Sequence, residues 1–251
     1  MGGHAWSTIA IELAIVVLGV FIGMQVSNWN QDRMTARQAA DFTARLRADL
    51  SEEDWRYRFL LAYSEEVLAN AKLAVGDLDG QQRLTDEALL VSAYRATQYS
   101  EAMSRRTTYD ELISTGAIGL IRDQTLRETA MRVYTNVRVF ENLVQEGARS
   151  RYREAFRMNF TNEVQHALAR DCGDKYIRAG DFEGISGTLD YPCHLDLPAD
   201  VISSAAATLR SSPEMRSYLR LRIADLETRI GDLRVNNKAV MESLRAISMQ
   251  P

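Results

Sequence analysis

Three residues of this sequence combine a reactive side chain with an informative position: Cys172, Cys193 and Glu12. The cysteines bracket a glycine-containing stretch, and a bond between them would close a loop of about 20 residues and stabilise the chain by roughly 3 kcal/mol. Such a bond needs an oxidising compartment, and two free thiols are the alternative. We predict a disulfide between Cys172 and Cys193.

Glu12 lies inside an apolar run, where an ionisable group costs a few kcal/mol if the run crosses a bilayer. Such a residue is a functional candidate that meets a polar group of a partner helix or a water-filled crevice. The alternative is that Glu12 lies close enough to the interface to reach water.

The sequence contains no residue pattern typical of an enzyme. The motifs GxxxxGK[ST], GxSxG and HExxH are absent, and His4, His166 and His194 have no periodic partner. The two cysteines and His194 lack the ligand-pair spacing of a zinc site. We therefore predict no catalytic activity, no cofactor and no metal. The formal net charge of −4 also favours no nucleic-acid partner.

The element that carries Glu12 reads as a transmembrane helix. Residues 6–26 are WSTIAIELAIVVLGVFIGMQV, 21 residues with one charge, which at about 1.5 Å per residue span the ~30 Å core of a bilayer. Trp6 and Trp29 lie near the two ends, where aromatic rings favour the headgroups. A basic start and a small-x-small cleavage site are missing, so we predict an uncleaved signal anchor over residues 1–30. A buried helix of a soluble protein is the alternative.

Gly19 and Gly23 form a GxxxG pair in this helix, and Glu12 lies on the same stripe, seven residues before Gly19. Small residues four apart let two helix backbones approach closely. We therefore expect Glu12, Gly19 and Gly23 to contact another transmembrane helix.

The remaining residues, 31–251, read as one extramembrane helical domain with a cysteine-bracketed loop at 172–193. Apolar residues recur at helical spacing after the span, which predicts that the first helix continues as a stalk up to the glycines at 76–80. The predicted fold is all-α: one N-terminal transmembrane helix that continues into an elongated helical-bundle or coiled-coil domain.

Cap and stop signals divide the domain further. A second helix is expected over residues 85–99. Thr107 and Asp110 are spaced like a capping box, with Gly116 as the stop, and Asp123 is the expected N-cap of the next helix. A short helix is expected over residues 199–209. The apolar pattern after Asp123 extends over Leu126, Val133, Val137, Phe140, Val144, Tyr152, Phe156, Phe160, Val164 and Leu168.

The last predicted helix starts at Ser212-Pro213-Glu214, a typical N-cap with proline at the first helical position. Isoleucine at position a, leucine at d and one a-position Asn favour a two-stranded parallel coiled coil. Packing of the same seam against helices of this chain is the alternative, and the preferred one. The seam consists of Leu219, Ile223, Leu226, Ile230, Leu233, Asn237, Val240 and Leu244, and continues to Ile247.

Orientation signals conflict. Arg33, Arg37, Arg45 and Arg47 follow the span, whereas only His4 and the amino terminus precede it, which would place the domain in the cytoplasm. The cysteine pair instead favours an oxidising compartment.

Two blocks of sequence resemble a family of bacterial single-pass inner-membrane proteins. Residues 19–30 read GVFIGMQVSNWN, similar to a GVFIGxQxxNWN signature, and residues 109–123 read YDELISTGAIGLIRD, similar to a YxELxSTGxxxLIxD block. The resemblance implies an anchor with a helical extracytoplasmic domain and no assigned activity. Members carry basic residues before the span, whereas this chain has none before Trp6, so either the start lies upstream of Met1 or the usual orientation signal is absent.

Family and cysteines together favour the periplasmic side of a bacterial inner membrane. The expected function is that of an anchor, scaffold or accessory subunit of a membrane complex, whose partners are the lipid bilayer and another membrane protein or a second copy of the chain. The alternative is a ligand-sensing periplasmic helical domain without its own output module.

Overall fold

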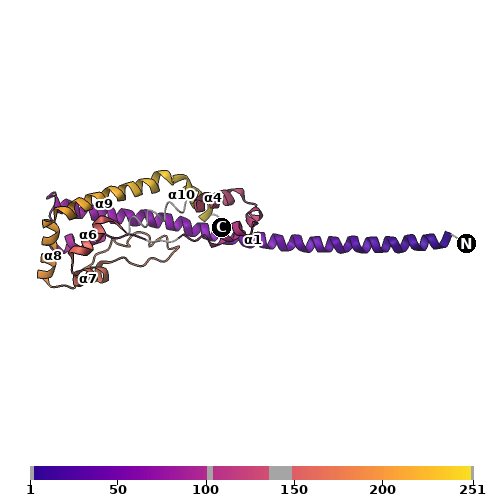
Figure 1. The fold of residues 1–251 in the computed structure, drawn as a ribbon, viewed down its shortest axis with the longest axis horizontal. Coiled ribbons are helices and arrows are strands. Elements are labelled where there is room, and N and C mark those ends of the chain that lie inside the picture. Colours follow the sequence, from indigo (N-terminus) through magenta and orange to yellow (C-terminus); the bar gives the residue numbers. More distant parts are fainter. Residues whose placement is uncertain (1–2, 101–103, 136–148, 250–251) are drawn as a thin grey trace.

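The protein is elongated and all-α in a computed structural model that describes residues 3–100, 104–135 and 149–249, with side chains from Glu12 onward. One long helix runs the length of the molecule, and the other helices gather around its second half (Figure 1). The helices are α1 (Gly3–Leu78), α2 (Asp86–Arg95), α3 (Thr107–Ser114), η1 (Ala117–Leu120), α4 (Gln124–Thr135), α6 (Arg151–Asn159), α7 (Asn162–Cys172), α8 (Ala199–Ser211), α9 (Pro213–Gly231), η2 (Asp232–Asn236) and α10 (Lys238–Ser248). The predicted fold class is confirmed.

Helix α1 has 76 residues and is therefore roughly 110 Å long. It contains no proline, and its apolar residues change from an all-round pattern to a one-sided pattern after the first third. Burial begins at Phe42, which is only 4% exposed. The helix ends before Gly80, whose φ of +73° is the left-handed conformation that stops helices, as the glycines predicted.

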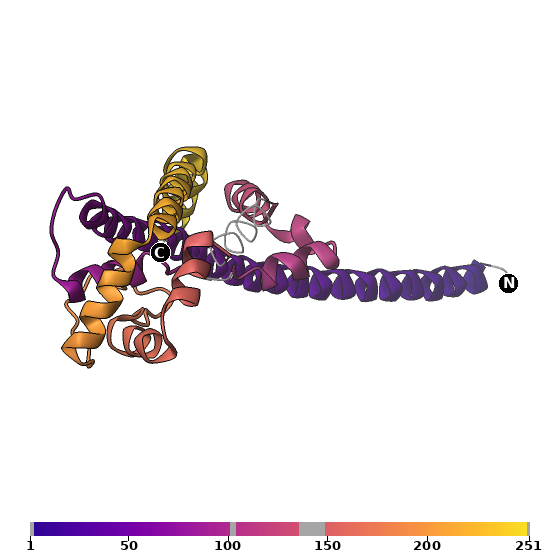
Figure 2. The same cartoon turned by 60° about the vertical axis from the view of Figure 1, so that its left-hand side comes forward.

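Two apolar cores line the second half of α1. The proximal core, nearer the N-terminus, joins α1 between Phe42 and Leu60 to α3, α4 and α10. The distal core joins α1 between Trp55 and Leu78 to α2, α6, α7, α8 and α9. Figure 2 shows α6, α7 and α8 at the far end of the molecule and α3 and α4 nearer the N-terminus.

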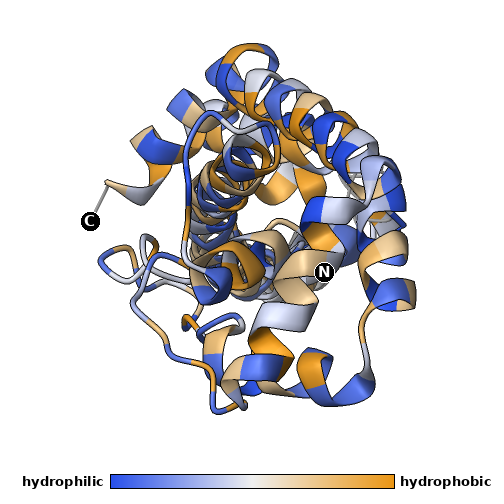
Figure 3. Cartoon of the chain, turned by 90° about the vertical axis from the view of Figure 1, so that its left-hand side faces the viewer, coloured by the Kyte–Doolittle hydropathy of each residue, from blue (hydrophilic) through white to orange (hydrophobic). Residues whose placement is uncertain are grey.

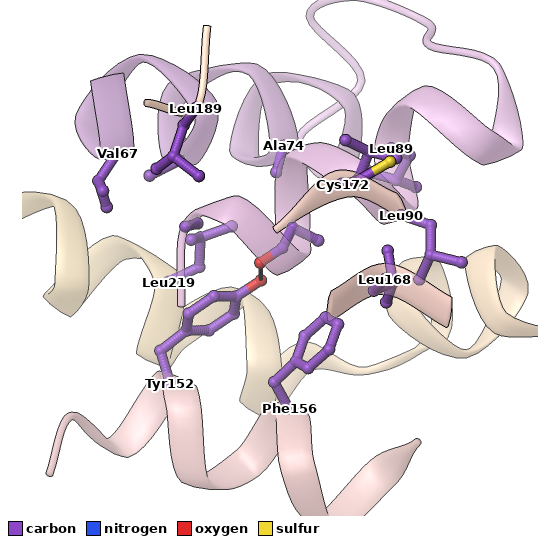
Figure 4. Close-up of a cluster of buried hydrophobic side chains, with 14 of the residues drawn as sticks. Val67, Ala74, Leu89, Leu90, Tyr152, Phe156, Leu168, Cys172, Leu189 and Leu219 are labelled. Atoms are coloured by element: carbon purple, nitrogen blue, oxygen red, sulfur yellow. Dashed lines mark hydrogen bonds between the residues drawn. The ribbon is translucent and has the colours of Figure 1, made fainter. Parts of the chain in front are cut away.

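The distal core is built from aromatic and aliphatic side chains of several helices (Figure 4). Tyr152 and Phe156 of α6 pack beside Leu168 of α7, and Tyr152 Oη donates a 3.0 Å hydrogen bond to the Ala93 carbonyl. Seen along the long axis, hydrophobic and hydrophilic residues alternate around each helix, as in amphipathic helices (Figure 3).

A buried ionic clasp fastens the far end of α1. Arg210 of α8 donates to Asp77 at 2.9 Å and to Asp86 at 2.5 Å, and Asp77 also accepts the Leu84 N–H at 2.7 Å. Burial opposes ionisation of Asp77, but the hydrogen bonds from Arg210 and Leu84 outweigh it and lower the pKa of Asp77. The hydrogen bond from Arg210 likewise lowers the pKa of Asp86. The clasp therefore joins the end of α1, the start of α2 and α8.

Several predicted helix starts are confirmed. Thr85, Asp123 and Ser212 accept hydrogen bonds from backbone N–H groups three residues later, as N-caps do. The helix predicted over residues 199–209 is α8. The capping box was wrong: α3 begins at Thr107 with Arg106 as its N-cap, and Asp110 forms an ion pair with Arg106 at 2.8 Å instead.

The apolar pattern from Leu126 to Leu168 does not belong to one helix. Ser150 and Thr161 are N-caps of two separate helices, α6 and α7, and the extended Phe160 separates them. The pattern continued across this break because Phe160 is buried like its helical neighbours. The predicted positions Val137, Phe140 and Val144 lie outside the described residues.

Candidate functional site

The apolar N-terminal part of α1 is uncovered. Every described residue from Glu12 to Gln38 is exposed, and Phe21 keeps 57% of its surface accessible. Helix α1 is the one helix among the described residues that is long and apolar enough to cross a membrane. An apolar surface of this length requires lipid or another protein to cover it.

The predicted contact residues Glu12, Gly19 and Gly23 lie on this uncovered part. A Cβ atom added at Gly19 or Gly23 would meet nothing within 4 Å, so the chain's own packing does not require glycine there. Glu12 has no ion pair or hydrogen bond among the described residues. Their contact with another helix stays a prediction.

The side of α1 that carries the two glycines continues into the domain as a ladder of alanines. Ala44 and Ala48 follow Gly19 and Gly23 by 25 residues (44 − 19 and 48 − 23), which is about 6.9 turns, so the four residues share one side of the helix. Leu46, which is fully buried, lies two residues from both alanines and therefore on the opposite side. We define the uncovered face of α1 by Gly19, Gly23, Ala40, Ala44 and Ala48.

A groove of about 690 Å³ runs along the alanine part of this face. Its other wall is formed by Leu120, Asp123 and Ile247, from η1, the start of α4 and α10. Arg47 reaches across to Asp123 at 3.2 Å. The hydrogen bond from the Leu126 N–H, assisted by Arg47, lowers the pKa of Asp123. The uncovered face therefore has a fixed wall beside it.

Sequence reasoning missed the alanine ladder. Alanine is the best helix former, so alanines in a helical segment carry little information by themselves. The signal that could have identified them is their regular spacing of four at residues 36, 40, 44 and 48, of which Ala44 and Ala48 are in phase with Gly19 and Gly23.

The predicted disulfide is present. Cys172 and Cys193 are bonded, with Cα atoms 5.5 Å apart, and Cys172 is fully buried. Arg95 of α2 lies beside the bond and donates to the Cys172 carbonyl at 3.3 Å and the Tyr191 carbonyl at 3.0 Å. The pair therefore closes a loop that also rests on α2.

Side chains of α1 hold the same loop from the other side. The Glu66 carboxylate accepts the N–H groups of Gly187 at 2.6 Å and Leu189 at 2.7 Å. Trp55 Nε1 donates to the Asp181 carbonyl at 2.8 Å, and Tyr63 Oη donates to Asp174 at 2.8 Å. The loop is thus an integral part of the domain surface.

The predicted seam packs within the chain. The described structure places it along α1, and α9, η2 and α10 replace the single helix that was expected. Asn237 does not occupy a coiled-coil position: its side chain and backbone N–H both bond the Asp232 carbonyl and close a π-helical turn. The buried seam residues are Leu219, Leu226, Ile230, Leu233, Val240 and Leu244, whereas Ile223 and Asn237 are partly exposed.

The burial of these side chains against α1 favours the intramolecular alternative. Pairing of the seam with a second copy stays a prediction.

Within the described part of the chain, no group of three or more His, Cys, Asp or Glu residues could hold a metal ion. Comparison with protein-family models, with curated proteins and with solved structures gives no significant match. The resemblance of residues 19–30 and 109–123 to inner-membrane anchors stays a prediction.

Proposed function

We propose that this protein is a single-pass membrane anchor, scaffold or accessory subunit that binds a partner helix along the uncovered face of α1. One observation supports the proposal most: Gly19 and Gly23 in the span and Ala44 and Ala48 in the domain lie on the same side of α1, and the described part of the chain leaves this side exposed. The partner is a helix of another membrane protein or a second copy of α1.

Small side chains explain how such a contact gains energy. In a bilayer the lipid tails are as apolar as the helix, so helices associate through close van der Waals packing, which small residues permit. Outside the bilayer, burial of the alanines and the groove wall adds the ordinary hydrophobic contribution. Glu12 lies on the same side and would find a polar partner there.

The proposed location is a bacterial inner membrane with the domain in the periplasm. The disulfide supports an oxidising compartment. The arginines after the span favour the opposite orientation, yet Arg45 and Arg47 form ion pairs with Glu111 and Asp123 of the folded domain. Two of the four arginines that favour the opposite orientation therefore form ion pairs within the folded domain.

Labelling of intact cells tests this orientation. A small membrane-impermeant maleimide should label the native cysteines only after a reductant is added, and without lysis of the inner membrane. Labelling that requires lysis would place the domain in the cytoplasm.

The contact itself is tested with Gly19→Leu/Gly23→Leu. We expect the wild-type protein in mild detergent to form a defined oligomer or to retain a membrane protein, and the double variant to lose that association. Because no other described part of the chain lies within 4 Å of the added Cβ atoms, the domain should fold unchanged.

Val17→Leu is the matched control, because Val17 lies two residues from Gly19 and faces away from it. It should leave the association intact. A wild-type monomer without a partner, or an association that survives in the double leucine variant, would refute the proposal.

Ligand sensing is the second candidate function. We propose no catalytic activity for the anchor or for the sensor. Ligand sensing is favoured by cavities of about 610 Å³ and 500 Å³ that flank α2, both within the size range of small-molecule sites. Saturable binding of a small molecule in one of them would support sensing, and its absence would leave the anchor role alone.

A further inference from the structure

The smaller of these two cavities has an unusual lining. It holds about 500 Å³ between α2, α6 and α7, far from the transmembrane end. Tyr94 and Phe156 line it, with ring centroids 6.2 Å apart, and Arg153, Arg157 and His166 add basic groups. None of the described residues that line the cavity carries a carboxylate.

The basic groups of the cavity form no ion pair among the described residues, although the charge of Arg153 acts on the nearby buried carboxyl of Asp174. None of the ion pairs between described residues involves Arg153, Arg157 or His166. Arg153 and Arg157 lie one turn apart on α6. Burial, together with the neighbouring charge of Arg157, lowers the pKa of Arg153, as expected for two cations that share a site. An oxyanion placed between them would relieve this repulsion.

Arg153 is held in position. Its guanidinium donates to the Thr97 carbonyl at 3.0 Å and lies 4.6 Å from the centre of the Tyr99 ring. Gln165 joins α6 to α7 by donating to the carbonyls of Arg157 at 3.0 Å and Phe160 at 2.7 Å. The cavity is therefore framed by fixed groups and needs little ordering when a ligand binds.

The C-terminal end of α2, which carries partial negative charge, also borders the cavity. Its last carbonyls accept hydrogen bonds within the domain: the Ala93 carbonyl from Tyr152 Oη at 3.0 Å and the Tyr94 carbonyl from the Thr97 N–H at 2.9 Å. Just beyond the helix, Arg222 donates to the Ala96 carbonyl at 3.3 Å and to the Gln98 carbonyl at 2.8 Å. The positive charge of Arg222 therefore offsets the partial negative charge at this end of α2.

We infer that the cavity is a binding site for a soluble organic oxyanion, a carboxylate or phosphate with an aromatic or aliphatic body. The guanidinium of Arg157 is free to bind the oxyanion in a two-pronged geometry, and Tyr94 and Phe156 would contact the apolar body. The inference is independent of the helix contact proposed for α1.

The position of the cavity excludes a headgroup of the host membrane. Burial raises the pKa of Tyr63 and the charge of Arg153 opposes this shift, so Tyr63 of α1 lies close to the cavity. Tyr63 is 37 residues beyond Val26 (63 − 26), or about 55 Å along α1. A ligand that reaches this site must be dissolved.

Calorimetric titration of the full-length protein in detergent tests the inference, with benzoate and inorganic phosphate as probes at constant ionic strength. Saturable binding of at least one probe is expected. Arg157→Gln should weaken that binding about tenfold, because it removes the exposed guanidinium. Arg157 is exposed, so the variant should remain folded, which circular dichroism checks.

Arg151→Gln is the matched control: it removes the same charge from an exposed residue of α6 that does not line the cavity. It should bind like the wild type. The inference is overturned if neither probe binds saturably, if Arg157→Gln binds like the wild type, or if both variants lose binding equally. Competition by anionic vesicles alone, without binding of either soluble probe, would also overturn it.

Discussion

Arg210 shows how one side chain can organise the far end of the domain. Its partner Asp77 has a side chain with no accessible surface, whereas Asp86 and Arg210 keep partial access to water. Removing one partner of a buried pair leaves an uncompensated charge, which is costly. We expect Arg210→Ala to lower the free energy of unfolding by roughly 3 kcal/mol, measured by urea denaturation in detergent.

The acid side of the stability profile reports on the same clasp. The pKa values of Asp77 and Asp86 are lowered in the folded protein, so their stabilisation is complete above the ordinary value of 3.8 and is lost as the pH falls through the folded values. Arg210→Ala should flatten this acid-side loss.

The neighbouring pair of Arg220 and Asp79 serves as the control. Its atoms are 2.8 Å apart, but the Arg220 side chain is 60% exposed. Arg220→Ala should therefore cost less than about 1 kcal/mol. Equal losses in the two variants would contradict the role given to Arg210.

At the scale of elements, α9, η2 and α10 form a broken helix that returns along α1. The π-helical turn at Asp232–Asn236 shifts the phase of the helix, so that Leu233 and Val240 both stay in the proximal core. The heptad spacing of the sequence is thus satisfied inside one chain.

Asn237→Leu discriminates this arrangement from a coiled coil between chains. Because Asn237 closes the π-helical turn by bonding the Asp232 carbonyl, the variant should lose about 1 kcal/mol of stability and keep its oligomeric state. Sedimentation or light scattering measures the latter. A changed oligomeric state would show that the seam pairs two chains.

Local signals predicted much of this fold. The length of α1, its stop at Gly80, the start of the second helix, the caps at Asp123 and Ser212, and the disulfide all depend on residue types that act over a few positions of the chain. The second helix was expected to reach residue 99 but ends at Arg95.

Other features depend on contacts that local patterns do not encode. The bond from Gly187 to Glu66 joins residues 121 positions apart, and the break at Asp232 interrupts an apolar repeat that continues on both sides of it. The uncovered face of α1 could be recognised only after the structure showed which side the domain covers.

At the scale of the whole molecule, α1 is the axis that connects two different environments. Its second half is the central element of both cores, while its first third presents an apolar, small-residue surface that no described part of the chain contacts. A partner helix that binds along this face would therefore also touch the domain. The far end of this domain carries the loop and both cavities beside α2.

Site-specific photo-cross-linking in native membranes tests the partner contact most directly. Both native cysteines are engaged in the disulfide, so Ala44→Cys introduces a single free thiol on the uncovered face, to which a benzophenone maleimide can be attached. Ser217→Cys places the same probe on an exposed position of α9 as the control. We predict one discrete cross-linked product from position 44 and none from position 217. No product from position 44, or the same products from both positions, would contradict the proposal that this face of α1 binds a partner helix.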